Sequence, residues 1–283
     1  MLKARVFTAI ALFVIFLPVF FLLPKSYLYI VLSFVISLAA WEWARLIWPN
    51  NPSRPVGYAV FVQVILLFSY LALQRIIFDS LSMSDAVFYF LQAMLLGSVF
   101  FWVVCAPYLL KIGLLIQIDR YTFFLGVVGI FVFVSAWYAC ILLRNTDLWL
   151  FMSILIVVWS ADIGAYFVGK KWGKTKLAAL ISPGKSWEGV FGGLGCVLMV
   201  FCIVKGFGLL DHFETHFQLK FFFSVIFLMG MSVVGDLFES LLKRLAGQKD
   251  SSQLLPGHGG VLDRLDALLP TLPIAAVLLQ LLR

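Results

Sequence analysis

Charged residues are scarce in this chain. Asp, Glu, Lys and Arg make up only 12% of its 283 residues, whereas hydrophobic residues make up 63%. Soluble domains carry about 25% charged and roughly 45–50% apolar residues. No soluble core could bury so much apolar surface. The composition therefore excludes an ordinary soluble protein and predicts an all-α, polytopic integral membrane protein.

Cysteine is also scarce, and no C-x-x-C pair is present. The four cysteines, Cys105, Cys140, Cys196 and Cys202, all lie within apolar stretches. Such residues are typically small core or lipid-facing side chains. We therefore expect neither a disulfide framework nor a cysteine metal site.

Apolar runs divide the chain into segments of the length that a helix needs to cross a bilayer, about 20 residues. We predict about nine transmembrane helices, at 5–23, 27–48, 56–77, 86–110, 121–143, 148–169, 188–209, 219–245 and 261–282. Loops are short in the first part of the chain, which predicts a helical scaffold in 1–147. The second part, 148–283, is predicted to be the catalytic region, with polar loops at 170–188 and 244–262.

Basic residues are unevenly shared between the two sides that this topology defines. Most of the 21 Lys and Arg residues fall on the side of the N-terminus and of both polar loops. The positive-inside rule therefore predicts a protein of the cell membrane with that side in the cytoplasm and the C-terminus outside. The formal net charge of +7 then requires no nucleic-acid partner, and it also suits a polyanionic substrate.

Three predicted helices carry acidic residues on one face, near the same side of the membrane. The acidic residues are Asp162, Asp236, Glu239, Asp263 and Asp266. By helical spacing, Tyr166 lies on the same face as Asp162, and Lys243 lies on the same face as Asp236 and Glu239. A charge within a membrane helix costs at least about 2.5–3.5 kcal/mol on insertion scales. These faces should therefore turn toward one another or toward a watery cavity.

Clustered carboxylates of this kind have two interpretations. Ion pairs such as Asp236–Lys243 and Glu239–Arg264 could simply join helices. Alternatively, the carboxylates hold a divalent cation, and Mg²⁺ prefers hard oxygen ligands together with substrate phosphates. We predict metal binding by Asp236, Asp263 and Asp266.

The two polar loops have features of anion sites. The loop at 170–188 combines lysines with glycines, whose backbone N–H groups can approach an anion. Ser182, Lys185 and Ser186 lie just before a predicted helix, and helix N-termini favour phosphate. The P-loop spacing is absent, and contact with anionic lipid is the alternative for this loop. The second loop ends in His258-Gly259-Gly260, just before Asp263. An anion site next to a metal site suggests a nucleoside triphosphate with Mg²⁺.

The segment from Ser240 to Asp266, SLLKRLAGQKDSSQLLPGHGGVLDRLD, resembles the signature of phosphatidate cytidylyltransferases, also called CDP-diacylglycerol synthases. DIGAYFVGKKWG, ISPGKSWEG and WEWARL are similar to other motifs of that family, with Lys170 as a minor variation. The resemblance implies a helical, usually homodimeric membrane enzyme that depends on Mg²⁺. It also leaves room for a second metal ion, which could be monovalent. The implied reaction converts CTP and phosphatidic acid into CDP-diacylglycerol and pyrophosphate.

The resemblance also implies roles for individual residues. Asp236, Asp263 and Asp266 would bind metal, and Lys243 and Arg264 would join them in catalysis. Contacts to the substrates would come from Lys185, Ser186, Ser182, Arg244, Lys249, His258, Gly259 and Gly260. Asp162, Tyr166, Glu188 and Glu239 would support the metal, contact the nucleotide or pair helices.

Other membrane functions fit the sequence less well. A transporter would also place charges in the membrane, but typical transporters have inverted repeats and broken helices at mid-membrane, and the polar groups here lie in one half of the chain. A related CTP-dependent lipid kinase would instead transfer the γ-phosphate to a polyprenol-like alcohol. The D-G-x-x-A-R pattern of CDP-alcohol phosphotransferases is missing.

Overall fold

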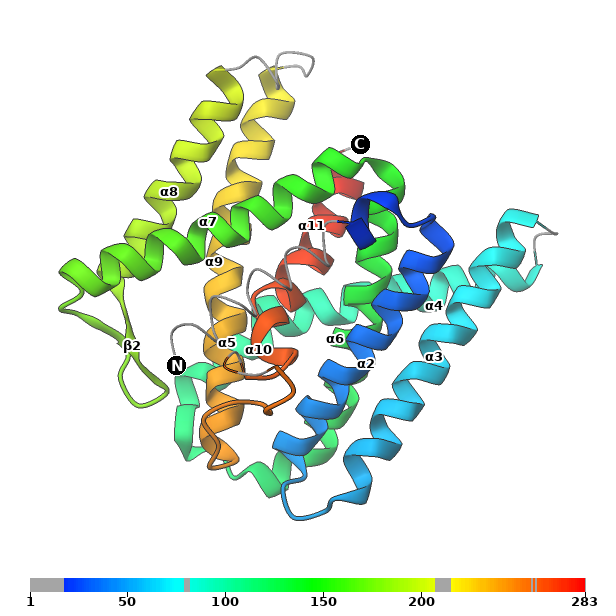
Figure 1. The fold of residues 1–283 in the computed structure, drawn as a ribbon, viewed down its shortest axis with the longest axis horizontal. Helices are drawn as coiled ribbons and strands as arrows, with labels where there is room; N and C mark the ends of the chain where they lie inside the picture. The colour runs from blue at the N-terminus through cyan, green and yellow to red at the C-terminus, as the bar shows by residue number, and fades with distance from the viewer. Residues whose placement is uncertain (1–17, 79–81, 207–214, 256, 258, 283) are drawn as a thin grey trace. The chain divides into compact units, whose positions relative to one another are not determined.

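The computed structural model describes residues 18–78, 82–206, 215–255, 257 and 259–282. This part of the chain is almost entirely helical, with one two-stranded sheet (Figure 1). The predicted all-α class is confirmed. The main helices are α2 (Lys25–Ile47), α3 (Ser53–Phe78), α4 (Ser82–Phe100), α5 (Ala106–Ile112), α6 (Ile118–Thr146), α7 (Leu148–Trp172), α8 (Trp187–Gly206), α9 (Thr215–Leu245), α10 (Leu262–Leu265) and α11 (Leu268–Leu282).

Among the described residues, 7 helical segments are long and apolar enough to cross a membrane. They correspond to the predicted spans from 27–48 through 219–245. In the fourth span, a short π-helix (Phe101–Cys105) joins α4 to α5. The predicted span at 5–23 lies mostly outside the described residues. The expected total of about nine spans is therefore not confirmed.

The predicted continuous helix at 261–282 is wrong. The chain forms the short α10, makes a turn at 266–267, and begins α11 at Leu268. Pro270 explains the break, because a proline ring clashes with the carbonyl four residues earlier in a continuous helix and has no N–H to offer it. Within the first turn of α11 the same proline costs nothing, since the N–H groups there have no intrahelical partner. The break leaves Asp266 in the turn.

The described chain forms two compact units, each built from separate stretches of sequence. The first comprises Met1–Ser98, Gln117–Ile141 and Leu242–Leu265. Its core contains buried tryptophans that join α2 to α6: Trp43 Nε1 donates to Leu125 O at 3.1 Å, and Trp137 Nε1 donates to Tyr29 O at 3.0 Å. These N–H groups are satisfied inside an otherwise apolar core, as buried indoles require.

The second unit comprises Val99–Ile116, Leu142–Leu241 and Asp266–Arg283. Its helices α7, α8 and α9 share a core that includes Ala161, Val197 and Met229. The N-terminal half of α8 lies directly against the C-terminal half of α7, because glycines remove the side chains between them. A Cβ at Gly193 would overlap Ala161 O, and one at Gly164 would overlap Gly192 O.

The sheet of this unit is a small antiparallel hairpin between α7 and α8. Strands β1 (Lys176–Ala178) and β2 (Ser182–Ser186) pair with Lys176 opposite Ser186 and Ala178 opposite Ser182. The turn of the hairpin lies at 179–181, and β2 runs directly into α8, so the predicted residues Ser182, Lys185 and Ser186 lie on a strand that leads into the helix. The division into a 1–147 scaffold and a 148–283 catalytic region stays a functional prediction.

Candidate active site

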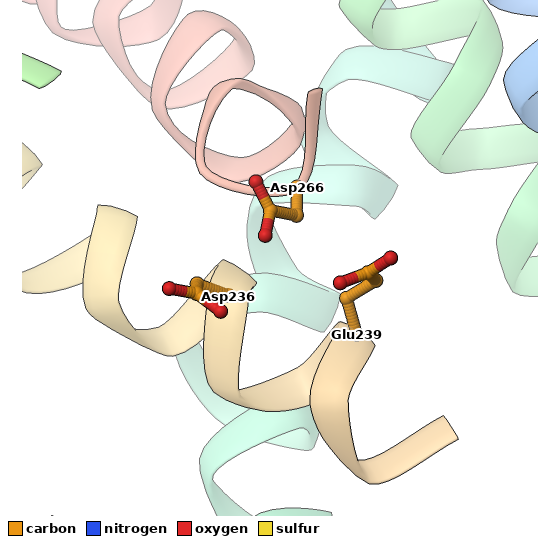
Figure 2. Close-up of side chains that lie close together, drawn as sticks. All are labelled: Asp236, Glu239 and Asp266. Atoms are coloured by element: carbon orange, nitrogen blue, oxygen red, sulfur yellow. The ribbon is translucent and has the colours of Figure 1, made fainter. Parts of the chain in front are cut away.

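Three carboxylates of the second unit converge. Asp236 and Glu239 lie on α9, and Asp266 lies in the turn before α11, with one oxygen of each within 4.8 Å of the others. Figure 2 shows the three side chains close together, two from one helix and Asp266 from the facing segment. Glu239 is buried, whereas Asp236 and Asp266 are half-buried. All possible ligand atoms are hard oxygens, the donor set that Mg²⁺ prefers.

The sequence around Gly235 explains how the turn reaches α9. Asp236 and Glu239 are three residues apart, so they lie on one face of the helix. A Cβ on Gly235 would overlap Asp266 O and the ring of Pro270. The glycine therefore permits the close approach that brings Asp266 to the other two carboxylates.

A lysine from the hairpin reaches the same cluster. Lys185, in β2, places its Nζ 2.5 Å from Asp236 Oδ2, with exposed side-chain fractions of 24% and 35% for the two residues. The hairpin register sets this position, because Ser182 at the other end of β2 is paired with Ala178. An ammonium group here can also pair with an anion bound at the carboxylates.

The start of α8 is stabilised by both of its predicted polar residues. Ser186 is buried and its Oγ accepts a hydrogen bond from Gly189 N at 3.2 Å, as a helix N-cap does. The Glu188 carboxylate accepts from Thr175 N, with distances of 3.0 and 3.2 Å to its two oxygens. In the structure, these side chains hold the hairpin onto the helix.

In the first unit, Asp263 makes a different set of contacts. Its Oδ1 lies 2.6 Å from Lys243 Nζ, and its Oδ2 accepts from Ser251 N at 3.0 Å and Gly260 N at 2.7 Å. Among the described residues, the group of carboxylates close enough to share a metal contains Glu239 and not Asp263. The metal role of Asp263 stays a prediction, while Asp266 and Asp236 are brought together as expected.

A residue that the sequence analysis did not assign, Glu42, lies at the base of the second polar loop. It is fully buried, and its carboxylate accepts hydrogen bonds from Ser252 Oγ and from the backbone N–H groups of Val261 and Leu262. A signal for it existed in the sequence, since Glu42 is an acidic residue within the apolar run of a predicted membrane helix. Such residues are usually paired and functional.

The other predicted site residues are mostly exposed. Arg244, Lys249, Arg264, Asp162 and Tyr166 are exposed, and Arg244 Nη1 donates to Gln248 O at 3.4 Å. Gly259 has a φ of 83°, a left-handed conformation that favours glycine. His258 lies outside the described residues. The structure thus leaves several cations accessible to a dissolved anion.

Comparison with known proteins identifies the class to which this fold and site belong. The model of the cytidylyltransferase family matches residues 3–282. The chain belongs to the cytidylyltransferase family. The resemblance inferred from its motifs is confirmed over nearly the full chain.

Relatives in three bacteria carry the same name. A protein of Pseudomonas aeruginosa named phosphatidate cytidylyltransferase is 38% identical over 281 residues, covering 99% of this chain and 97% of the relative. One of Haemophilus influenzae with that name is 33% identical over 282 residues and covers 96% of both chains. One of Staphylococcus epidermidis is 39% identical over 137 residues, covering 48% of this chain and 51% of the relative.

Proposed function

We propose that this protein transfers CMP from CTP to phosphatidic acid, giving CDP-diacylglycerol and pyrophosphate. The observation that carries the proposal is the convergence of Asp236, Glu239 and Asp266 beside Lys185, in a chain of the cytidylyltransferase family. Carboxylates with a neighbouring lysine suit a triphosphate bound with a divalent cation. The name shared by relatives that match nearly the whole chain supports the same substrates.

The carboxylate cluster fits Mg²⁺ by its donor chemistry. Its three side chains offer only oxygens, and two of them are half-buried, so water and substrate phosphates can complete the coordination. Asp236, Glu239 and Asp266 would hold the ion. Bound Mg²⁺ would neutralise phosphate charge and stabilise the pyrophosphate leaving group. Asp263 as a further ligand, and a second metal ion, belong to the proposal as predictions.

The cationic side chains would bind the phosphates. Lys185 and Lys243 each lie beside a carboxylate in the structure. When substrate binds, each ammonium group would pair with a phosphate oxygen, either in place of its carboxylate or in addition to it. Arg244, Lys249 and Arg264 are exposed and would hold the outer phosphates of CTP. Arginine suits this task because its planar fork binds phosphate oxygens in pairs.

The reaction needs no protein nucleophile. An oxygen of the lipid phosphate, already an anion at neutral pH, forms a bond to the α-phosphorus of CTP, and the bond from that phosphorus to the bridging oxygen of pyrophosphate breaks. The work of the protein is to align the two anions and to offset their repulsion. A site near the end of a membrane helix suits this task, because the lipid head group cannot leave the interface.

The proposal extends to topology and assembly. The loops at 170–188 and 244–262 would face the cytoplasm, where CTP is found, with the C-terminus outside. The homodimer implied by the family resemblance would form in the membrane. Cysteine-accessibility labelling of single-cysteine variants tests the orientation, and the mass of the purified protein in detergent by light scattering tests the dimer.

One assay tests the proposed reaction against its rival. The purified protein is given phosphatidic acid, a polyprenol-like alcohol as the acceptor for a kinase, Mg²⁺, and CTP labelled at either the α- or the γ-phosphorus. Cytidylyl transfer labels the lipid only from α-labelled CTP and releases pyrophosphate. Lipid labelled only from γ-labelled CTP would refute the proposal and support a CTP-dependent lipid kinase.

A further inference from the structure

Glu42 holds both ends of one loop. Near the end of α2, its Oε1 accepts from Ser252 Oγ at 2.5 Å and from Val261 N at 3.0 Å. Its Oε2 accepts from Ser251 Oγ at 3.0 Å and from Leu262 N at 2.5 Å. Each carboxylate oxygen therefore binds one residue at the start of the loop and one at its end. We call residues 250–262 the anchored loop.

Besides Glu42, hydrogen bonds to Asp263 and within the loop itself hold the described residues of the anchored loop. Its residues from 253 to 254 are exposed, and its internal contacts include a hydrogen bond from Leu255 N to Gly259 O at 2.8 Å. It passes through Gly257 and Gly259, both in left-handed backbone conformations. Gly260 must also be a glycine, because a Cβ there would overlap Ser251 Oγ and both oxygens of Glu42. Such a loop owes its shape to the polar contacts at its base rather than to apolar burial.

The same base positions Asp263. The Ser251 hydroxyl lies 3.0 Å from Glu42 Oε2 and 2.9 Å from Asp263 Oδ2. Asp263 Oδ2 also accepts from Ser251 N and Gly260 N. Ser251 and Gly260, which orient Asp263 through these bonds, belong to the anchored loop: Ser251 is bonded to Glu42, and Gly260 packs against it. Asp263 in turn holds Lys243 through its other oxygen.

We propose that Glu42 is a positioning residue for the cytidylyl transfer: from α2 it fixes the anchored loop, and through Ser251 and the loop backbone it sets the orientation of Asp263 and Lys243. The inference rests on the proposed function for its catalytic consequence. It adds a role for a residue on a helix remote in sequence from the loop that carries the family motif.

The hydrogen-bond chemistry makes a carboxylate necessary at residue 42. Each of its oxygens accepts from a backbone N–H, and a backbone N–H can only donate. In Glu42→Gln the side-chain NH₂ would face either Val261 N–H or Leu262 N–H, whichever way the amide is turned. One buried donor then loses its acceptor and meets another donor. Rotation of the amide cannot relieve this conflict.

The test combines loop exchange with kinetics on the full-length protein in detergent micelles. Deuterium uptake is measured for peptides covering 250–262 and, as an internal reference, for peptides of α7 and α8. For Glu42→Gln we expect uptake in 250–262 to become about tenfold faster or more, since a buried donor left without its acceptor weakens the closed loop by that order. The α7 and α8 peptides should exchange as in the wild type.

The kinetic arm uses only monodisperse, folded protein, so that a loss of folded material does not count as a loss of rate. We expect kcat to fall about tenfold or more while KM for CTP changes less, because misplacement of groups at the reacting centre lowers the rate of the bound complex. Glu42→Asp keeps the charge on a shorter side chain and should restore part of both signals.

A matched control lies on the same helix. Ser37 is buried in α2, and its hydroxyl donates to Gln63 Oε1 on α3 at 2.6 Å, so Ser37→Ala removes a partly buried hydrogen bond without altering the anchored loop. It should leave uptake in 250–262 and kcat close to wild type. Equal effects of Ser37→Ala and Glu42→Gln would overturn the proposal, since they would show a general loss of packing.

Two further outcomes decide the matter. Wild-type uptake in 250–262 for a folded Glu42→Gln variant would refute the inference. Where Glu42→Gln yields no folded protein, Glu42→Asp and Ser252→Ala carry the test, and unchanged uptake in both would refute it. If the wild type makes no CDP-lipid, the proposed function fails, yet the uptake of the variants still decides whether Glu42 holds the loop.

Discussion

Gly235 offers a sharp test of how the carboxylate cluster is assembled. The residue has no side chain at the point where the Asp266–Pro270 segment contacts α9, and a Cβ there would overlap both Asp266 O and the Pro270 ring. Neither neighbour is the far end of a flexible side chain. In Gly235→Ala, the turn that carries Asp266 must therefore move away from α9.

The size of the effect follows from this geometry. Forcing an extra methyl group into a packed contact costs typically about 1–3 kcal/mol, while replacing glycine by alanine in a helix returns about 1 kcal/mol. The fold should thus survive with a small net loss. The cluster should not survive intact, because its oxygens lie within 4.8 Å of one another only while the turn touches the helix. We expect the apparent Mg²⁺ concentration for half-maximal activity to rise about tenfold or more.

The assay is a Mg²⁺ titration of cytidylyl transfer at saturating CTP, with Gly230→Ala as the matched control. Gly230 lies on the same helix, and a Cβ there would meet nothing within 4 Å. That variant should keep the wild-type Mg²⁺ dependence and gain slightly in thermal stability. Wild-type Mg²⁺ dependence in folded Gly235→Ala would refute the view that the close approach assembles the metal site.

Three further predictions extend the tests. Asp236→Asn should lower kcat by about a hundredfold or more, since the proposed metal ligand and the partner of Lys185 are both lost, whereas Asp162→Asn on α7 should lower it far less; similar losses in a side-by-side rate assay would contradict the proposed metal role of Asp236. Lys185→Ala should raise KM for CTP more than it alters the Mg²⁺ dependence, as measured by varying CTP and Mg²⁺ independently, and the opposite pattern would argue against a phosphate role. Trp43→Phe should destabilise the protein by about 1–3 kcal/mol because the buried indole bond to Leu125 O is lost and the smaller ring fills less of the core; an unchanged midpoint of thermal unfolding would show that this bond contributes nothing.

The sequence alone was enough for the class of protein and for the position of most helices. A low charge content and long apolar runs follow directly from what a bilayer tolerates, so the seven long helices lie where the runs predicted them. The family could also be inferred from 240–266, because a motif is contiguous. Pro270 could have warned of the break before α11, since its effect on the preceding turn is local.

The site was only partly readable in advance. Helical spacing placed Asp236 and Glu239 on one face, but it gave no reason to prefer Glu239 over Asp263 as the neighbour of Asp266. That outcome depends on the turn at 266–267 and on the space at Gly235. Lys185 reaches Asp236 because of the hairpin register, which has no signature as simple as a helical repeat.

What the sequence by itself determined is therefore whatever short-range physics controls: the membrane class, the helices and the identity of the motif. Only the tertiary structure decided which charges meet. The contact of Glu42 with Leu262 joins residues 220 positions apart, and no local pattern encodes it. Within an apolar core, a buried carboxylate must find donors wherever packing brings them, so its partners are set by the whole fold rather than by its neighbours in the chain.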